Sequence, residues 1–335
     1  MTSKLRVGIL GAGWAATSHA IAFSRLPNVV VNAFWNRTRA RVEKLAGELN
    51  QSDFQIYDHW QELIEKADID VVSVATAELL RREPVEMALE RGLHVLVEKP
   101  FSIELADAQA MVQAANKADA ISAICLNWRY APGAQVSWQG IREGWIGQIF
   151  DVQMVWRFGA RPRAMYETWP WFTEKTDVLG GGGSHEFDRA RFLTGSEFIR
   201  IASRVRPFSL PQEPEYTVHG TYSLIADLSN GVEGDFRLTL TTGQSEWYLV
   251  LNGAKGSLTV THETVIRQRE AEEKSQSLEI PASQRIPDGI DMIQHTWNRL
   301  IADFVTAVRN NDKRHVSVPH LPTLVDGLRT PSVSQ

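Results

Sequence analysis

Glycines near the N-terminus form the first segment whose residue types and spacing could do chemistry. Gly11-Ala12-Gly13-Trp14-Ala15-Ala16 follows the apolar run Val7–Leu10 and opens a helical stretch. In this G-x-G-x-x-A pattern the first glycine permits a tight turn, the second lets the backbone approach a pyrophosphate, and the small third residue lets helix and strand pack closely. The helix N-terminus then turns its amides toward the phosphates. The turn predicts dinucleotide binding, with contacts from Gly11, Ala12, Gly13, Trp14 and Ala15.

Residues at the end of the next strand should decide whether the site binds a ribose with a free 2′-hydroxyl or one with a 2′-phosphate. A site for NAD usually places Asp or Glu there, because a carboxylate accepts a hydrogen bond from the 2′-hydroxyl. This chain has Asn36-Arg37-Thr38 and no acid. Arg37 could pair with a 2′-phosphate and Thr38 could donate a hydrogen bond to it, so we predict NADP(H) in preference to NAD(H). Stacking of Arg37 on the adenine, or a solvated arginine in a loop, remain open alternatives.

Tryptophans and arginines gather in the middle of the chain and suggest a substrate pocket. Six of the eleven tryptophans are Trp128, Trp138, Trp145, Trp156, Trp169 and Trp171. Aromatic faces suit the C–H faces of a pyranose or cyclitol, although most of these rings are expected in the core. Trp169 precedes a run of glycines and is the better pocket candidate. Arg129, with three arginines between residues 157 and 163, could bind a carboxylate or phosphate or pair with neighbouring acids.

Short apolar strands that alternate with helices must position the glycine-rich turn. The expected strands are Val7–Leu10, Val29–Phe34, Val71–Val74, Leu93–Val97 and Ser122–Leu126. Apolar residues three and four apart predict helices at Arg39–Leu49, Pro84–Arg91 and Glu104–Lys117. This alternation predicts a parallel sheet with helices on both faces, an α/β doubly wound Rossmann domain over residues 1–126.

Residues 127–335 have a different character and are expected to form a second domain. Pro132–Glu143 predicts one helix, and strand-rich segments follow with turn signals such as Ser229-Asn230-Gly231 between them. This pattern predicts an antiparallel sheet. Gln294–Arg309 predicts a final amphipathic helix, so the second domain is of the α+β class.

Composition limits the classes of function. The chain has 335 residues, 43% of them hydrophobic, and a net charge of -5, which argues against disorder and against general attraction to nucleic acid or anionic membranes. The single cysteine, Cys125, excludes an intramolecular disulfide and favours a reducing compartment. No apolar run approaches the length that a bilayer requires, so a cytoplasmic protein is expected. His315 and His320 match no standard ligand spacing, and we expect no metal site.

Glu98-Lys99-Pro100 after the strand Leu93–Val97 resembles the signature of the Gfo/Idh/MocA oxidoreductases, the family of glucose-fructose oxidoreductase and inositol dehydrogenase. Other segments fall in the order typical of that family: Gly11–Ala16, Val71–Thr76, Asn127–Pro132, Gly144–Gly147 and Gly182–Gly195. The resemblance covers nearly the whole chain. It implies a Rossmann domain and a second α+β domain with a large, open, mostly antiparallel sheet. That sheet usually forms the interface of a homodimer or homotetramer.

The resemblance also implies the reaction and the residues that perform it. The reaction is hydride transfer between the carbinol carbon of a polyol or sugar and C4 of a nicotinamide. Lys99 would bind the reacting hydroxyl, since an ammonium disfavoured by desolvation shares its proton more readily. His185 would act as acid or base, because imidazole titrates near neutrality. The implied cofactor site includes Ala75, Thr76 and Glu98, and Asp188 would face the substrate or support the histidine.

The chain departs from the family pattern at several positions. Gly181 stands where many members carry an aspartate four residues before the histidine, and Arg81 stands where a histidine is usual. The closing C-terminal helix is expected to be short or absent. We therefore carry two hypotheses. The first is an NAD(P)-dependent oxidoreductase acting on a secondary hydroxyl or ketone of a sugar, cyclitol or related cyclic diol. The second is a non-catalytic NAD(P)-binding sensor of the same fold.

Overall fold

Two compact units make up the chain in the computed structural model, which describes residues 4–49, 54–159, 179–210, 213–270, 272 and 274–330. The first unit contains the chain up to Asn127 together with Ile290–Arg329, and the second contains Trp128–Gly289. The expected boundary, between residues 126 and 127, lies one residue from this division. Residues 290–329 differ from expectation, because they group with the first unit rather than the second.

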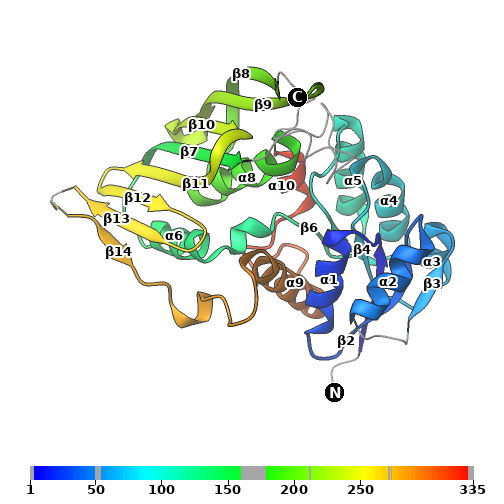
Figure 1. The fold of residues 1–335 in the computed structure, drawn as a ribbon. Coiled ribbons are helices and arrows are strands. Elements are labelled where there is room, and N and C mark those ends of the chain that lie inside the picture. The colour runs from blue at the N-terminus through cyan, green and yellow to red at the C-terminus, as the bar shows by residue number, and fades with distance from the viewer. Residues whose placement is uncertain are drawn as a thin grey trace. The chain divides into compact units, whose positions relative to one another are not determined.

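The first unit is built on a six-stranded parallel sheet with the order β3-β2-β1-β4-β5-β6 (Figure 1). Its strands are β1 (Leu5–Leu10), β2 (Val29–Trp35), β3 (Gln55–Tyr57), β4 (Val71–Val74), β5 (His94–Val97) and β6 (Ser122–Ile124). All four side chains of β4 are buried, as expected for a strand covered on both faces. The predicted doubly wound fold is confirmed. The chain changes direction across the sheet between β1 and β4, and the ends of these two strands flank the crevice in which such folds bind ligands.

Helices cover both faces of this sheet. They are α1 (Trp14–Ser24), α2 (Arg39–Leu49), α3 (Trp60–Lys66), α4 (Arg82–Glu90), α5 (Leu105–Lys117), α9 (Met292–Asn310) and α10 (Leu324–Leu328). Side chains of α3, α4 and α5 pack with Val72 and Val74 of β4. Ser73 lies between these two residues and points to the other face, where it bonds His19 of α1.

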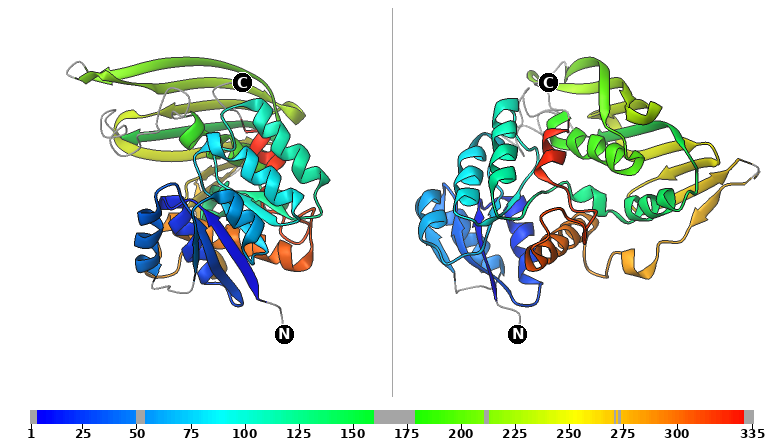
Figure 2. Two further views of the ribbon diagram at one scale, coloured as in Figure 1. Left: turned by 90° about the vertical axis from the view of Figure 1, so that its right-hand side faces the viewer. Right: turned by 180° about the vertical axis from the view of Figure 1, so that it is seen from behind.

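The helix α9 explains why residues far apart in sequence share one unit. It lies alongside α1 (Figures 1 and 2), and the rings of Phe23 and Phe304 meet edge to face with centroids 6.5 Å apart. The five-residue α10 packs against α5 and β6, and a Cβ on Gly327 would lie 2.6 Å from the side chain of Ile124. The expected closing helix is therefore present and short.

The second unit is built on an eight-stranded sheet with the order β14-β13-β12-β11-β7-β10-β9-β8. In chain order its strands are β7 (Ile149–Gly159), β8 (Phe198–Leu210), β9 (Glu213–Leu228), β10 (Glu233–Thr239), β11 (Thr241–Gly253), β12 (Gly256–Val260), β13 (Val265–Arg269) and β14 (Gln276–Leu278). All neighbours are antiparallel except β7 and β10, which are parallel. The predicted large, mostly antiparallel sheet is confirmed.

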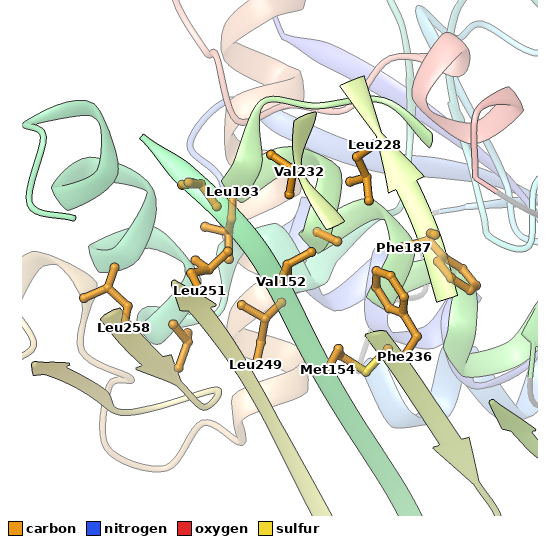
Figure 3. Close-up of a cluster of buried hydrophobic side chains, with 14 of the residues drawn as sticks. Val152, Met154, Phe187, Leu193, Leu228, Val232, Phe236, Leu249, Leu251 and Leu258 are labelled. Carbon is orange, nitrogen blue, oxygen red and sulfur yellow. The ribbon is translucent and has the colours of Figure 1, made fainter. Parts of the chain in front are cut away.

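One face of this sheet carries the core of the second unit. Buried side chains of β7, β10 and β11, including Met154, Phe236 and Leu249, pack with Phe187 and Leu193 (Figure 3). The last two residues belong to α8 (Ser184–Thr194), and α6 (Pro132–Arg142) adds to the same core. Short helical turns complete the described elements: η1 (Glu78–Leu80), η2 (Asn127–Tyr130), η3 (Leu179–Gly183), η4 (Ser229–Gly231) and η5 (Ala282–Gln284). Among the described residues, no helix combines the length and the apolar character that crossing a bilayer requires.

Candidate active site

The glycine-rich turn joins β1 to α1 at the carboxyl edge of the parallel sheet. Gly11 has a φ of 125°, and a Cβ there would lie 2.6 Å from the carbonyl oxygen of Ala75. Its amide donates a hydrogen bond of 2.7 Å to the carbonyl of Trp35. Gly13 precedes α1, and a Cβ there would meet no atom within 4 Å. A side chain would fill this open space, so Gly13 leaves the first amides of α1 accessible to a pyrophosphate, and the turn fits a dinucleotide.

The end of β2 presents a free arginine. The side-chain amide of Asn36 donates to the carbonyl of Thr38 at 3.0 Å, which holds the short loop in place. Arg37 and Thr38 are exposed. Within the described residues, Arg37 makes neither a hydrogen bond nor an ion pair, so its charge remains available to an anionic ligand.

Glu98 is the centre of a buried polar cluster at the end of β5. It is 3% exposed, and its Oε1 accepts hydrogen bonds from Nε2 of His19 at 3.1 Å and from the indole of Trp297 at 3.2 Å. Its Oε2 accepts from the amide of Lys99 at 2.8 Å. Nδ1 of His19 lies 2.8 Å from the hydroxyl of Ser73, which can donate to it when Nε2 carries the proton.

Hydrogen bonds keep this buried carboxyl group ionised. Burial by itself would raise the pKa of Glu98, but the hydrogen bond from His19 and the positive charges of Lys99 and Arg81 lower it overall. Trp297 also packs edge to face on Trp14, whose ring is 66% exposed, with centroids 4.7 Å apart. Helix α9 therefore reaches the start of α1, the helix that follows the glycine-rich turn. The sequence shows no local signal for this contact, because the two tryptophans lie at opposite ends of the chain.

Three side chains of the same cluster carry metal-ligating atoms. Nε2 of His19, a carboxylate oxygen of Glu98 and Sγ of Cys125 all lie within 4.8 Å of one another. Burial and the neighbouring Glu98 raise the pKa of the Cys125 thiol well above its ordinary value, which opposes the thiolate that a metal prefers. The charges of Arg81 and Lys99 oppose a further cation. The absence of a metal site stays a prediction.

Lys99 follows β5 directly and is half-buried. Its pKa is lowered because burial disfavours the ammonium and Arg81 repels it, while Glu98, Glu78 and Cys125 act in the opposite direction. Strand β5 neighbours β4, whose end provides Ala75 and the buried Thr76. The sheet order therefore brings the lysine and the glycine-rich turn to one edge of the first unit. A lysine with a lowered pKa exchanges its proton closer to neutrality.

His185 lies in the first turn of α8 in the second unit. It is 6% exposed, and its ring lies 5.8 Å from that of Trp128 between centroids. The glycine turn η3 leads into this helix. A Cβ on Gly182 would lie 2.5 Å from the ring of Trp156, so glycine allows the close approach of the chain to β7 at that position.

Two of the residues predicted to face substrate bond one another. The Nε and Nη2 of Arg129 donate to the two carboxylate oxygens of Asp188 at 2.7 and 2.6 Å, and both side chains are buried. Arg191 adds a contact of 3.5 Å to the same carboxylate. The third predicted residue, Trp169, lies outside the described residues. The pair holds α8 to the segment that follows Asn127, and its part in substrate binding stays a prediction.

Sequence reasoning missed a second buried cluster, which joins two residues of the helix that carries His185 to side chains from other segments of the second unit. The guanidinium of Arg189 is fully buried and lies 3.5 Å from the ring centre of Trp247 and 5.0 Å from that of Trp128. It pairs with Glu186, which also accepts a hydrogen bond of 2.5 Å from the indole of Trp247. Burial raises the pKa of Glu186 more than Arg189 and Trp247 lower it.

His262 completes this second cluster as a neutral ring. It stacks on Trp247 with centroids 4.2 Å apart and planes 10° apart. Its Nδ1 lies 3.0 Å from a guanidinium nitrogen of Arg189, which makes it the acceptor. Burial and the charge of Arg189 lower the pKa of His262 to about 2. The side chains Trp128, Arg189, Trp247 and His262 thus pack against one another, and Trp128 also contacts His185.

A comparison with known protein families identifies the class of this protein. A family model described as "Oxidoreductase family, NAD-binding Rossmann fold" matches residues 5–124, and one described as "GFO/IDH/MocA C-terminal domain" matches residues 135–259. These matches cover more than half of the chain. The protein belongs to the Gfo/Idh/MocA family of oxidoreductases, as the resemblance implied.

Characterised relatives share part of the chain. Levoglucosan dehydrogenase of Pseudarthrobacter phenanthrenivorans is 26% identical over 227 residues, which are 63% of this chain and 56% of that protein. Myo-inositol 2-dehydrogenase of Thermotoga maritima is 27% identical over 203 residues, 59% of this chain and 57% of that protein. The alignments thus span little more than half of either relative. An oxidoreductase from Agrobacterium radiobacter, solved with NAD+, L-tartaric acid and magnesium, has the same fold, with a TM-score of 0.83, 19% identity, and coverage of 98% of this chain and 93% of that chain.

Proposed function

We propose that this protein is an NAD(P)-dependent oxidoreductase that transfers a hydride between a nicotinamide and a secondary hydroxyl or ketone of a sugar, cyclitol or related cyclic diol. The observation that carries the proposal is Lys99, a half-buried lysine with a lowered pKa at the same sheet edge as a glycine turn that fits a pyrophosphate. The relatives named as levoglucosan and inositol dehydrogenases support the substrate class.

The residues of the first unit would hold the cofactor. Gly11, Gly13 and the first amides of α1 would bind the pyrophosphate, while Ala75 and Thr76 would line the crevice between β1 and β4. When bound, the nicotinamide supplies the group that accepts or donates the hydride.

Lys99 and His185 would handle the proton of the reaction. During oxidation of an alcohol, a neutral Lys99 amine would bind the substrate hydroxyl and accept its proton. The imidazole of His185 would be the acid or base that exchanges this same proton, so that one proton and one hydride leave the alcohol in total. Reduction of a ketone would return the hydride to the carbonyl carbon and the proton to its oxygen.

The first test measures nicotinamide fluorescence while NADPH or NADH is titrated into the purified protein, followed by turnover on a panel of polyols, sugars and cyclitols. We expect binding of the nucleotide and oxidation of at least one cyclic substrate. Binding without any turnover would support the non-catalytic sensor instead. Failure to bind either nucleotide would contradict both hypotheses.

We also propose that NADP(H) is preferred over NAD(H), because Arg37 is exposed and no acid follows β2. Arg37→Ala should weaken NADP(H) binding by about tenfold and change NAD(H) binding little, since the arginine would pair only with the 2′-phosphate. Arg41→Ala on the exposed part of α2 is the matched control. Equal losses for both nucleotides would point to stacking on adenine, and no loss to a solvated arginine.

We further propose that the eight-stranded sheet forms a homodimer or homotetramer. Ile199 and Ile225 on β8 and β9 are 71% and 61% exposed, so this sheet offers apolar side chains that a second copy could cover. Light scattering after size-exclusion chromatography should give a multimer for the natural chain and a smaller species for Ile225→Asp. A monomeric natural chain would contradict the proposal. The cytoplasm stays an expectation from the sequence, which rests on the single cysteine and on the lack of an apolar run of bilayer length.

A further inference from the structure

We propose that Arg81 is a positioning residue for Lys99: its guanidinium holds the backbone of Glu98, Lys99 and Pro100 and keeps a positive charge beside the lysine. The inference rests on the proposed function, because it assigns Arg81 a role through a lysine proposed to act on substrate. It goes beyond that function because it assigns a role to a residue that would act on the reaction through Lys99.

The hydrogen bonds of Arg81 join two strand ends. Its Nη1 donates to the carbonyls of Glu98, at 2.5 Å, and of Pro100, and its Nη2 donates to the carbonyl of Lys99 at 3.3 Å. Its Nε and Nη2 also donate to the carbonyl of Thr76 at 3.0 and 2.8 Å. The planar fork thus ties the loop after β4 to three successive residues after β5. A shift of Arg81 would move the backbone from which the Lys99 side chain extends.

The charge of Arg81 is not cancelled by a direct ion pair. The residue is 4% exposed, and within the described residues no carboxylate forms an ion pair with it. A buried guanidinium is costly unless hydrogen bonds satisfy it, and here carbonyl oxygens do so without neutralising it. Its field therefore acts on its neighbours, and together with burial it lowers the pKa of Lys99.

Other charged and titratable groups near Lys99 work against Arg81. Glu98, Glu78 and Cys125 favour the ammonium of Lys99. The carboxylate of Glu98 also accepts hydrogen bonds from His19 and Trp297. Glu78 is 8% exposed, and its Oε1 has no hydrogen-bond partner among the described residues. Arg81 balances these groups, so its removal should leave Lys99 more firmly protonated.

The test measures the pKa of Lys99 directly, with competitive acetylation by acetic anhydride across a pH series and mass spectrometry of the peptide that contains Lys99. Arg81→Gln should raise the midpoint for Lys99 by about one pH unit, since a nearby like charge shifts a pKa by about 1–3 units. Its oxidation activity should fall by about tenfold at neutral pH, and the pH at which activity rises should move upward with the labelling midpoint. The affinity for the nucleotide should change by less than about threefold, which is smaller than the tenfold loss of activity expected from a pKa shift of one unit.

Arg82→Gln is the matched control, because Arg82 is the next residue, is 46% exposed and pairs with Glu86 and Asp107 on the surface. It should leave the Lys99 midpoint and the pH profile unchanged. An Arg81→Gln variant with the natural Lys99 midpoint would overturn the inference, even if that variant were less stable. If Arg81→Gln does not fold, Arg81→Lys takes its place. The lysine lacks the planar guanidinium fork, so turnover should fall while cofactor binding persists. Turnover of Arg81→Lys at the natural rate would also overturn the inference.

Lys99→Ala separates this inference from the proposed function. Natural turnover of Lys99→Ala would refute the role of Lys99 itself, whatever Arg81 does. Loss of turnover in Lys99→Ala with an unmoved midpoint in Arg81→Gln would refute only the positioning role of Arg81.

Discussion

Among the described residues, each unit contains a buried glutamate that accepts a hydrogen bond from a tryptophan indole, and the net pKa shifts of the two carboxyl groups have opposite directions. The pKa of Glu98 in the first unit is lowered, whereas that of Glu186 in the second unit is raised. Glu98 accepts hydrogen bonds from His19, Trp297 and the amide of Lys99. Glu186 relies on Arg189 and Trp247. Additional donors and nearby cations keep the first carboxylate charged despite its desolvation.

The two clusters also place their arginines differently. Arg189 pairs with the carboxylate of Glu186 and is enclosed by Trp247 and Trp128, and its charge also helps to keep the neighbouring His262 neutral. Among the described residues Arg81 bonds carbonyl oxygens and no carboxylate, and its charge acts on Lys99. Both charges influence a neighbouring group, but the neighbour of Arg81 is the lysine proposed to act on substrate, whereas Arg189 acts within a packed ion pair. We therefore expect the first cluster to govern chemistry and the second to govern stability.

The largest effect should follow from Lys99→Ala. Removing a group that transfers a proton should lower kcat by about 10²–10⁴-fold, with nucleotide binding nearly unchanged. The measurement is steady-state turnover together with fluorescence titration of the nucleotide. Lys66→Ala, at a lysine 62% exposed that pairs with Glu62, should behave as the natural protein. If Lys99→Ala turned over as fast as the natural protein, the expectation that the first cluster governs chemistry would be wrong.

Next in size is the effect of Arg189→Met on stability. Breaking a buried pair leaves Glu186 without its cation and should lower the free energy of unfolding by about 3–5 kcal/mol. Denaturant unfolding of the full chain measures it. Arg200→Met breaks an exposed pair with Asp227 and should cost less than about 1 kcal/mol. Adding Glu186→Gln to Arg189→Met should recover part of the loss, because the unpaired charge is gone. Equal costs for the two arginines would contradict the structural role of the second cluster.

The pH dependence of stability should depend on His262. Its pKa falls from 6.5 to about 2 on folding, so the unfolded chain binds more protons between these values and stability is lost as pH falls below 6.5. This residue should contribute a slope of up to about 1.4 kcal/mol per pH unit. Unfolding of His262→Phe at a series of acidic pH values should show a correspondingly smaller slope. His59→Phe, at an exposed histidine, should keep the natural slope, and an unchanged slope in both variants would show that His262 is not held neutral.

The smallest expected effect concerns Glu98 and Arg81, whose opposite charges should shift the pKa of Lys99 in opposite directions. Glu98→Gln removes a negative charge beside Lys99, so the pKa of Lys99 should fall by about one unit, opposite to the change expected for Arg81→Gln. Labelling of Lys99 across the pH series measures both variants. Shifts in the same direction would show that backbone displacement, rather than charge, controls the lysine.

Local patterns predicted the elements whose signal lies within a few residues. The apolar run Val71–Val74 was predicted with the bounds that the structure has, because a strand buried on both faces needs continuous apolar side chains. The strand Gln55–Tyr57 and the helix Trp60–Lys66 were missed. Only Tyr57 is buried in that strand, which is defined by its pairing with β2 rather than by its own residues.

Sequence reasoning also singled out Glu98–Pro100 at a strand end. It predicted that Arg129 and Asp188 face substrate, which stays a prediction, but it did not predict that the two side chains bond each other. Arg81 was noted only as a departure from a family pattern. Its bonds to carbonyls about 18 residues away depend on two strand ends meeting at one sheet edge, which no local pattern reveals.

The amino-acid sequence alone predicted most strands and helices of the first unit, the glycine turn and the lysine at a strand end, because each depends on the periodicity or spacing of neighbouring residues, and the resemblance of its motifs indicated the family. Only the tertiary structure decided that α9 returns to α1, that Trp297 and His19 hold Glu98, and that Trp247 and His262 enclose Arg189. These contacts join residues from distant parts of the chain, and the burial that sets their protonation exists only once the chain has folded.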